Sequence, residues 1–177
     1  MADKRVFLGF SLTPKQAQYI EAIQQQLPIS IRLVPRDNLH MTLAFLGQAS
    51  NKTIDALILR VDALNKPCFK VTLDLIEHWQ KPKILCLKGT ASDPNLMALA
   101  KTAQLIAQQH GLHQSEHHYN PHITLARKAK VMVNDVTFQP ILLQPTVLHL
   151  FESFAGTNGV EYPILHSWSL SDINSIK

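Results

Sequence analysis

The sequence predicts an α+β protein with two pseudo-symmetric lobes of mainly antiparallel β-sheet that face a central cleft, and with helices packed on the outside. Three observations lead to this prediction. Short apolar or alternating segments interleave with three helical patterns. Most connections between the strand-like segments are short, as in antiparallel sheets. A seven-residue segment occurs twice, which suggests two similar lobes. The length of 177 residues fits a single bilobal domain over residues 1–177.

Runs of apolar residues, several of which alternate with polar ones, predict the strands. The expected strands lie at residues 6–10, 31–34, 38–47, 69–76, 84–87, 120–126, 146–151 and 161–170. The segment 156–159 reads Gly-Thr-Asn-Gly and predicts a turn between the last two strands. Residues 128–145 contain two prolines and are expected to be irregular.

Apolar residues spaced three and four apart predict three helices. A polar residue that can cap the first turn precedes each of them, and a proline or glycine follows each of them. The expected helices lie between Thr13 and Pro28, between Ser50 or Asn51 and Pro67, and between Ser92 or Asp93 and Gly111.

Composition limits the classes of function. A hydrophobic content of 46% and a charged content of 17% are typical of a folded protein. The formal net charge of +4, with nine histidines uncounted, suits a polyanionic ligand. No apolar run approaches the roughly 18 residues that cross a membrane, and no signal peptide is evident. We therefore expect a cytoplasmic protein without membrane contact. We also expect it to be a monomer. Cys68 and Cys86 are expected to be buried thiols, with a disulfide as the minor alternative.

The repeated segment is the main functional signal. Residues 38–44 read Asn-Leu-His-Met-Thr-Leu-Ala, and residues 120–126 read Asn-Pro-His-Ile-Thr-Leu-Ala. A single His-x-Thr on a strand usually has no function, because both residue types are ordinary strand residues. Two copies that share their flanking residues and stand 82 residues apart indicate two halves of one site.

Strand geometry assigns the side chains of each copy to faces, because successive side chains point to opposite sides. His40 and Thr42 share one face of the first strand, and His122 and Thr124 share one face of the second. The opposite face of the first copy is expected to pack on the core through Met41, Leu43 and Phe45.

Two facing imidazoles suit paired acid–base chemistry, because one can be neutral and the other protonated near neutral pH. Cleavage of a phosphoester needs a base for the attacking water and an acid for the departing oxygen. It also needs donors to the non-bridging oxygens, a role that Thr42 and Thr124 can fill. Such a site requires no metal or other cofactor.

The two copies resemble the paired His-x-Thr-x signatures of the two-histidine phosphoesterase superfamily. Within it, residues 38–47 and 121–127 are similar to the bacterial RNA 2',3'-cyclic phosphodiesterases, also called 2'-5' RNA ligases. The resemblance extends to residues 7–12, the region of Trp79 and residues 151–162, and so covers nearly the whole chain.

The resemblance implies hydrolysis of an RNA 2',3'-cyclic phosphate to a 2'-phosphomonoester, and a weaker, reversible 2'-5' ligation of RNA ends. The partner would be RNA, or a nucleotide, with a cyclic phosphate end. By the family's convention, His40 would be the proton donor and His122 the proton acceptor, a division that the residues themselves leave open. Thr42, Thr124 and Arg127 would bind the phosphate.

The arginines raise a question of geometry. Arg127 lies five residues after His122, so a regular strand would direct it to the opposite face. A bulge or the end of the strand must redirect it, or the assignment is wrong. Arg32 and Arg36 could also reach RNA phosphates, although solvated surface positions are the first interpretation.

The sequence leaves three alternatives open. A cluster of histidines could bind zinc, although no cysteine lies near it and its spacing matches no standard zinc finger: His110, His113, His117, His118 and His122. The site could bind RNA ends without catalysis, or it could act on a cyclic phosphate of a nucleotide that is not RNA. Aromatic residues that could stack on a base are Phe45, Trp79, Tyr119 and Tyr162.

Overall fold

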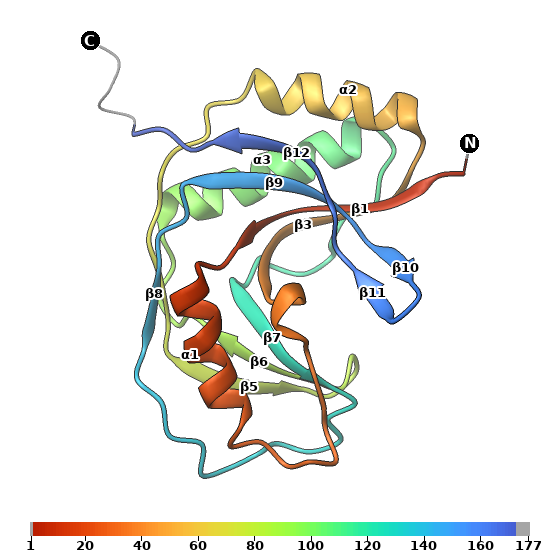
Figure 1. The fold of residues 1–177 in the computed structure, drawn as a ribbon. Coiled ribbons are helices and arrows are strands. Elements are labelled where there is room, and N and C mark those ends of the chain that lie inside the picture. Colours follow the sequence, from red (N-terminus) through yellow and green to blue (C-terminus); the bar gives the residue numbers. More distant parts are fainter. Residues whose placement is uncertain (1, 173–177) are drawn as a thin grey trace.

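The computed structural model describes residues 2–172 and has the expected α+β class (Figure 1). The helical elements are α1 (Pro14–Gln24), the 3₁₀ turn η1 (Arg36–Asn38), α2 (Asn51–Asp62) and α3 (Pro94–Gln109). The strands are β1 (Lys4–Ser11), β2 (Arg32–Leu33), β3 (His40–Ala49), β4 (Val71–Leu73), β5 (Leu75–Trp79), β6 (Ile84–Lys88), β7 (His122–Arg127), β8 (Ile141–Leu143), β9 (Val147–Glu152), β10 (Phe154–Gly156), β11 (Gly159–Glu161) and β12 (Ile164–Ser169).

One eight-stranded sheet organises the fold. Its strand order is β12-β9-β1-β3-β7-β6-β5, and β2 pairs with β7 beside this path. Its strand pairs are antiparallel, as are the separate β10–β11 and β4–β8 ribbons. The two motif strands, β3 and β7, are neighbours at the middle of the sheet, so the halves expected from the repeat meet there.

Each helix begins where its cap residue predicts. The Thr13 side chain accepts a hydrogen bond from the Gln16 backbone, and the Gln16 side chain accepts one in return from the Thr13 backbone, which completes a capping box. Ser50 caps α2 and Asp93 caps α3. No helix within residues 2–172 has the length and hydropathy of a membrane-spanning segment.

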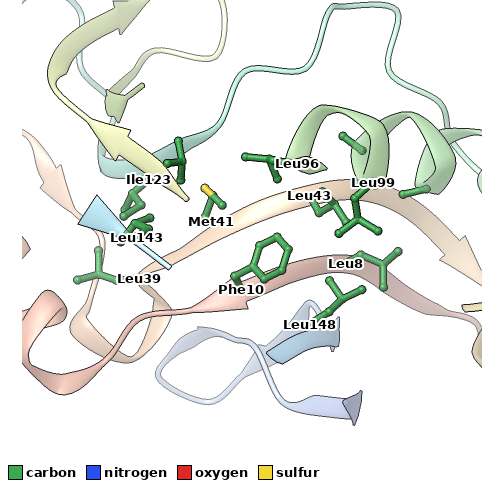
Figure 2. Close-up of a cluster of buried hydrophobic side chains, with 14 of the residues drawn as sticks. Leu8, Phe10, Leu39, Met41, Leu43, Leu96, Leu99, Ile123, Leu143 and Leu148 are labelled. Carbon is green, nitrogen blue, oxygen red and sulfur yellow. The ribbon is translucent and has the colours of Figure 1, made fainter. Parts of the chain in front are cut away.

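The core lies on one face of the sheet, between the strands and the helices. Figure 2 shows Met41 and Leu43 of β3 directed toward Leu96 and Leu99 of α3, with Ile123 of β7 beside them. Helix α3 packs against β3, and α1 packs against β7. Because Met41 and Leu43 are almost fully buried, truncating either to alanine would cost about 2–5 kcal/mol.

Three sequence expectations about strands were wrong. Residues 161–170 do not form one strand, because Glu161 ends β11 of the separate β10–β11 ribbon and β12 of the large sheet begins at Ile164. Residues 69–76 do not form one strand, because the chain leaves one sheet and enters another at Asp74. The Asp74 carboxylate accepts hydrogen bonds from the backbone and hydroxyl of Thr90 at 3.0 and 2.7 Å. The Asp74 backbone N–H donates to Lys88, and this junction separates β4 from β5.

The stretch 128–145 is not wholly irregular either, because β8 lies inside it and pairs with β4. Pro140 precedes β8 and Pro145 follows it, so the prolines mark the limits of a three-residue strand rather than its absence. Cys68 and Cys86 are both free thiols, half-buried and buried respectively, so the disulfide alternative is wrong.

Candidate active site

The central residues of the two motifs pair directly across the sheet. Met41 of β3 is opposite Ile123 of β7 in an antiparallel register, and both side chains are fully buried. The residues on either side of this pair therefore point to the opposite face of the sheet. We call that face the site face.

On the site face, the register sets each histidine against the threonine of the other copy. Counting from the Met41–Ile123 pair, His40 lies across from Thr124 and Thr42 lies across from His122, with Cβ atoms about 5 Å apart in such pairs. All four side chains are half-buried. The structure thus brings together the four motif residues that the repeat predicts, around an approximate twofold axis.

A bulge in β7 redirects Arg127. Thr124 and Ala126 lie opposite two consecutive residues of β6, so Leu125 is an extra residue. Leu125 and Ala126 are both fully buried. The extra residue shifts the alternation by one position, so the exposed Arg127 lies on the same face as His122 and Thr124. This bulge is the feature that the sequence argument required.

A second side chain holds that bulge in place. The Leu125 carbonyl accepts hydrogen bonds from the Val34 backbone N–H at 3.0 Å and from the Gln24 amide at 2.9 Å. The Gln24 amide also donates to the Val34 carbonyl. Gln24 is only 4% exposed, so α1 fixes the local path of β7 through a buried polar contact.

The first copy bulges at the equivalent leucine, and this corrects the expected position of Phe45. Thr42 and Ala44 lie opposite consecutive residues of β1, so Leu43 is the extra residue. Phe45 therefore lies on the site face rather than on the core face with Leu43, and it pairs with Phe7 of β1. The alternation rule failed because it assumes a regular strand. Phe45 occupies the position that Arg127 occupies in the second copy.

His40 is fixed by its neighbours on both ring nitrogens. Its Nδ1–H donates to the Asn38 carbonyl at 2.7 Å, and its Nε2 lies 3.0 Å from the Thr42 hydroxyl oxygen. The ring centroids of Phe7 and Tyr162 lie 4.9 and 5.0 Å from that of His40.

Burial lowers the pKa of His40 to about 4, against the opposing effect of the Asn38 carbonyl. The positive charges of His122 and Arg127 lower it further. Arg127 therefore lies within electrostatic reach of the imidazole of the other copy.

His122 has the same backbone contact but a different environment. Its Nδ1–H donates to the Asn120 carbonyl at 2.8 Å, so its Nε2 is the nitrogen available for chemistry. The Trp79 ring centroid lies 4.5 Å from the His122 ring. Burial lowers the pKa of His122, while the Asn120 carbonyl and the Glu77 carboxylate oppose the change and Lys88 adds to it.

An ion pair that no sequence motif indicates lies beside His122. Lys88 is the cross-strand neighbour of His122, and its Nζ lies 3.2 Å from Glu77. Glu77 also accepts a hydrogen bond from the Trp79 indole. Together with Lys88, this bond holds the pKa of the Glu77 carboxyl below its usual range, against the effect of burial. Only the pairing of β5, β6 and β7 places these residues at the site, and no local pattern indicates it.

The other aromatic candidates divide into two groups. Trp79 and Tyr162 contact His122 and His40 respectively. Tyr119 instead donates a hydrogen bond from its hydroxyl to the Thr42 carbonyl at 2.9 Å, and burial raises its pKa. Tyr119 thus anchors the loop before β7 to β3. Phe45 contacts the guanidinium of Arg5 and the ring of His113.

The two earlier arginines also differ. Arg36 forms an ion pair with Glu21 at 2.7 Å and donates to the Pro14 carbonyl, so it ties η1 to α1. Arg32 is exposed and lies directly opposite Arg127. No group of three or more His, Cys, Asp or Glu side chains in residues 2–172, including the histidines of segment 110–122, is arranged to hold a metal ion.

Comparisons with known proteins agree with this arrangement. Residues 11–86 match the family model described as LigT-like phosphoesterase. The Escherichia coli (strain K12) RNA 2',3'-cyclic phosphodiesterase is 37% identical over 81% of this chain and 82% of its own length. A protein of the same name from Methanocaldococcus jannaschii is 26% identical over 93% of this chain and 99% of its own length.

Solved structures give the same result. The crystal structure of E. coli LigT complexed with 3'-AMP has a TM-score of 0.88 and 30% identity, and the match covers 96% of this chain and 99% of that one. The crystal structure of E. coli LigT complexed with phosphate has a TM-score of 0.84 and 28% identity, over 97% of this chain and 100% of that one. With its repeated His-x-Thr segments on one face of a shared sheet, the chain belongs to the LigT-like phosphoesterase family.

Proposed function

We propose that the protein is an RNA 2',3'-cyclic phosphodiesterase that opens the cyclic phosphate to a 2'-phosphomonoester without a metal ion. The observation that carries this proposal is the pairing of Met41 with Ile123, which turns two imidazoles and two threonine hydroxyls toward one face. Membership of a family whose relatives bear that enzyme name supports the choice of substrate.

In the proposed reaction, His122 is the base and His40 is the acid. The His122 Nε2 removes a proton from a water molecule, whose oxygen attacks phosphorus. The bond between phosphorus and the ribose 3' oxygen breaks, and the His40 Nε2–H gives its proton to that oxygen. The carbonyls of Asn38 and Asn120 hold both rings by Nδ1, which directs each Nε2 to the substrate. Each positioned group contributes about 10²–10⁴-fold.

The lowered pKa values fit this division once the substrate is bound. In the free protein, both rings are neutral at pH 7, because burial lowers both pKa values. The anionic phosphodiester raises the pKa of His40 through its own negative charge and by offsetting the charge of Arg127. An acid with a low intrinsic pKa releases its proton readily, and the Glu77 carboxylate strengthens His122 as a base.

Thr42, Thr124 and Arg127 are proposed to bind the non-bridging oxygens of the phosphate. The Thr42 hydroxyl lies 3.0 Å from His40 Nε2 and donates to it while the ring is neutral. When His40 is protonated, Nε2 no longer accepts this bond, and the hydroxyl hydrogen can turn to a phosphate oxygen. Arg127 supplies a full positive charge beside the oxygens as the reaction proceeds.

The same geometry supports a slower ligation. If the 5'-hydroxyl of a second RNA replaces water, His122 removes its proton, the bond to the 3' oxygen breaks, and a 2'-5' phosphodiester forms. The reverse reaction uses the same two groups in exchanged roles. We propose that residues 1–177 act as one bilobal, monomeric domain in the cytoplasm, a location that the free thiols Cys68 and Cys86 fit.

The direct test is incubation of the purified protein with RNA that ends in a 2',3'-cyclic phosphate, in the presence of a chelator. The expected product is the 2'-phosphomonoester. A 3'-monoester, or activity that the chelator abolishes and zinc restores, would contradict the proposal. Tight binding of an unchanged RNA end would favour the non-catalytic alternative, and turnover limited to cyclic phosphates of non-RNA nucleotides would change the substrate class.

A further inference from the structure

Positively charged side chains gather at the end of β7 beyond the motif. We call this region the basic corner and define it by six residues, all of them exposed: Arg32, Lys81, Lys83, Arg127, Lys128 and Lys130. They come from three segments, namely β2, the turn between β5 and β6, and the end of β7 with the residues that follow it.

Backbone contacts hold these three segments together. Arg127 pairs with Arg32 of β2 on one side and with Ile84 of β6 on the other. Beyond the strand, the Ala129 N–H donates to the Lys83 carbonyl at 2.9 Å. The His78 ring lies 2.7 Å from the Ala129 carbonyl and donates to it through Nε2. The arrangement is therefore built by the fold and does not depend on mobile side chains meeting by chance.

The charges of the basic corner are not neutralised within the protein. Segments 32–33, 79–84 and 127–130 contain no Asp or Glu. Within residues 2–172, the ion pairs involve Lys4, Arg36, Lys88 and His166, and none involves a residue of the corner. Like charges directly opposite each other, as in Arg32 and Arg127, destabilise a sheet. An anionic ligand would remove that cost.

The corner is continuous with the proposed active site. β7 leads from His122 to Arg127, and its bulge turns Arg127 onto the site face. On the same edge of β7, β3 pairs near His122 and β2 pairs near Arg127. A chain whose end is held by His40 and His122 can therefore pass Arg127 and run onto the corner.

We propose that Arg127 stays with the reacting phosphate, and that the other five residues of the basic corner bind the sugar–phosphate backbone of the RNA that precedes the cyclic end. This inference rests on the proposed function and adds a consequence to it: the enzyme distinguishes an RNA end from a free cyclic mononucleotide. The contacts are to phosphates, so they give affinity without sequence preference.

The test compares two substrates with the same reacting group. One is adenosine 2',3'-cyclic monophosphate, and the other is an oligoadenylate of about six nucleotides with the same cyclic end. The double variant Lys83→Gln/Lys130→Gln removes two corner charges. The double variant Lys52→Gln/Lys101→Gln removes two exposed charges from α2 and α3 and is the matched control.

The wild-type protein should have a higher kcat/KM for the oligonucleotide than for the mononucleotide. At low salt, the ratio of the kcat/KM values for the oligonucleotide and the mononucleotide should be about tenfold smaller in the corner variant. For the oligonucleotide, the slope of log kcat/KM against log salt concentration should be shallower in the corner variant by about 1.4, which is about 0.7 for each lost phosphate contact. The control variant should match the wild type in both respects, and Arg32→Gln should reproduce the loss independently.

Failure of this inference is distinguishable from failure of the proposed function. If the wild-type protein hydrolyses neither substrate, the proposed function is wrong. If it hydrolyses both, and the corner variant keeps the wild-type preference and salt dependence, the basic corner does not bind RNA. An equal loss on both substrates would also overturn the inference, because it would assign the corner to the reacting phosphate or to stability.

Discussion

The two copies of the motif share a scaffold but not an environment. Both strands bulge at the leucine of the repeat, and both histidines donate from Nδ1 to the carbonyl two residues earlier. A side chain from outside the strand anchors each bulge region. Tyr119 donates to the Thr42 carbonyl, and Gln24 donates to the Leu125 carbonyl.

The differences lie in what surrounds each ring. His40 packs among aromatic rings and contacts its own threonine. His122 has Trp79 on one side and the Glu77–Lys88 ion pair nearby. After the bulge, the first copy places a phenylalanine on the site face and the second places Arg127. A symmetric backbone thus supplies geometry, and the neighbours supply the asymmetry that an acid and a base require.

The largest expected effect separates the two histidines by role. His40→Ala and His122→Ala should each lower kcat on a 2',3'-cyclic phosphate by about 10²–10⁴-fold. A phosphodiester with a p-nitrophenyl leaving group needs no protonation of the departing oxygen. On that substrate His40→Ala should retain most of the wild-type rate, whereas His122→Ala should not. The opposite pattern would exchange the two roles, and circular dichroism would verify that both variants fold.

The next effect is on stability, and its dependence on pH reports the burial of the two histidines. Because the folded-state pKa of His40 lies near 4 and its ordinary value is 6.5, protonation favours the unfolded chain. The contribution of His40 to the free energy of unfolding is therefore fully present above pH 6.5, where the ring is neutral in both states. This contribution falls by up to about 3 kcal/mol as the pH falls toward 4.

Urea denaturation at pH 7 and pH 4.5 checks this prediction. The wild-type free energy of unfolding should fall between these two values, and His40→Gln should show a smaller fall. His122→Gln should reduce the fall as well, since burial also lowers the pKa of His122. A fall that is identical in His40→Gln and the wild type would show that the imidazole is not desolvated.

Equivalent positions after the two bulges should differ in their contribution to catalysis. Arg127→Gln should lower kcat/KM by about 10–100-fold, because a charged hydrogen bond to the phosphate is lost. Phe45→Gln, at the matching position of the first copy, should change kcat/KM by less than about threefold, since no phosphate contact is proposed there. If the two variants lose activity equally, Arg127 does not have a role in phosphate binding that Phe45 lacks.

The smallest expected effects come from the anchors. Tyr119→Phe and Gln24→Met each remove a buried donor while keeping similar volume, and each should lower the free energy of unfolding by about 1–2 kcal/mol. Gln24→Met should also lower kcat/KM, because it frees the bulge that directs Arg127. Thermal and urea unfolding measure the first effect, and steady-state kinetics measure the second. An unchanged kcat/KM in Gln24→Met would show that the contact of Gln24 with the bulge does not affect catalysis.

Much of the fold follows from local patterns in the chain. The caps Thr13, Ser50 and Asp93 determine where the helices begin, and alternating segments indicate the main strands. The repeated His-x-Thr indicates four residues that the sheet brings to one face, because each lies next to a buried, paired residue.

What the sequence did not reveal depends on pairing between distant segments. The bulges at Leu43 and Leu125 arise from register with β1 and β6, so simple alternation placed Phe45 on the wrong face and left Arg127 undecided. The change of sheet at Asp74 depends on its contacts with Thr90, which lies 16 residues away in the chain.

The most direct measurement is single-turnover hydrolysis of an RNA 2',3'-cyclic phosphate by four proteins: wild type, His40→Ala, His122→Ala and the double variant. The effects of removing two groups that act in the same step are strongly non-additive. Each single variant should therefore lose about 10²–10⁴-fold of the single-turnover rate. The double variant should be only slightly slower than the slower of the two single variants. If either single variant keeps the wild-type rate, or the two losses multiply in full, the imidazoles of β3 and β7 do not form one catalytic pair.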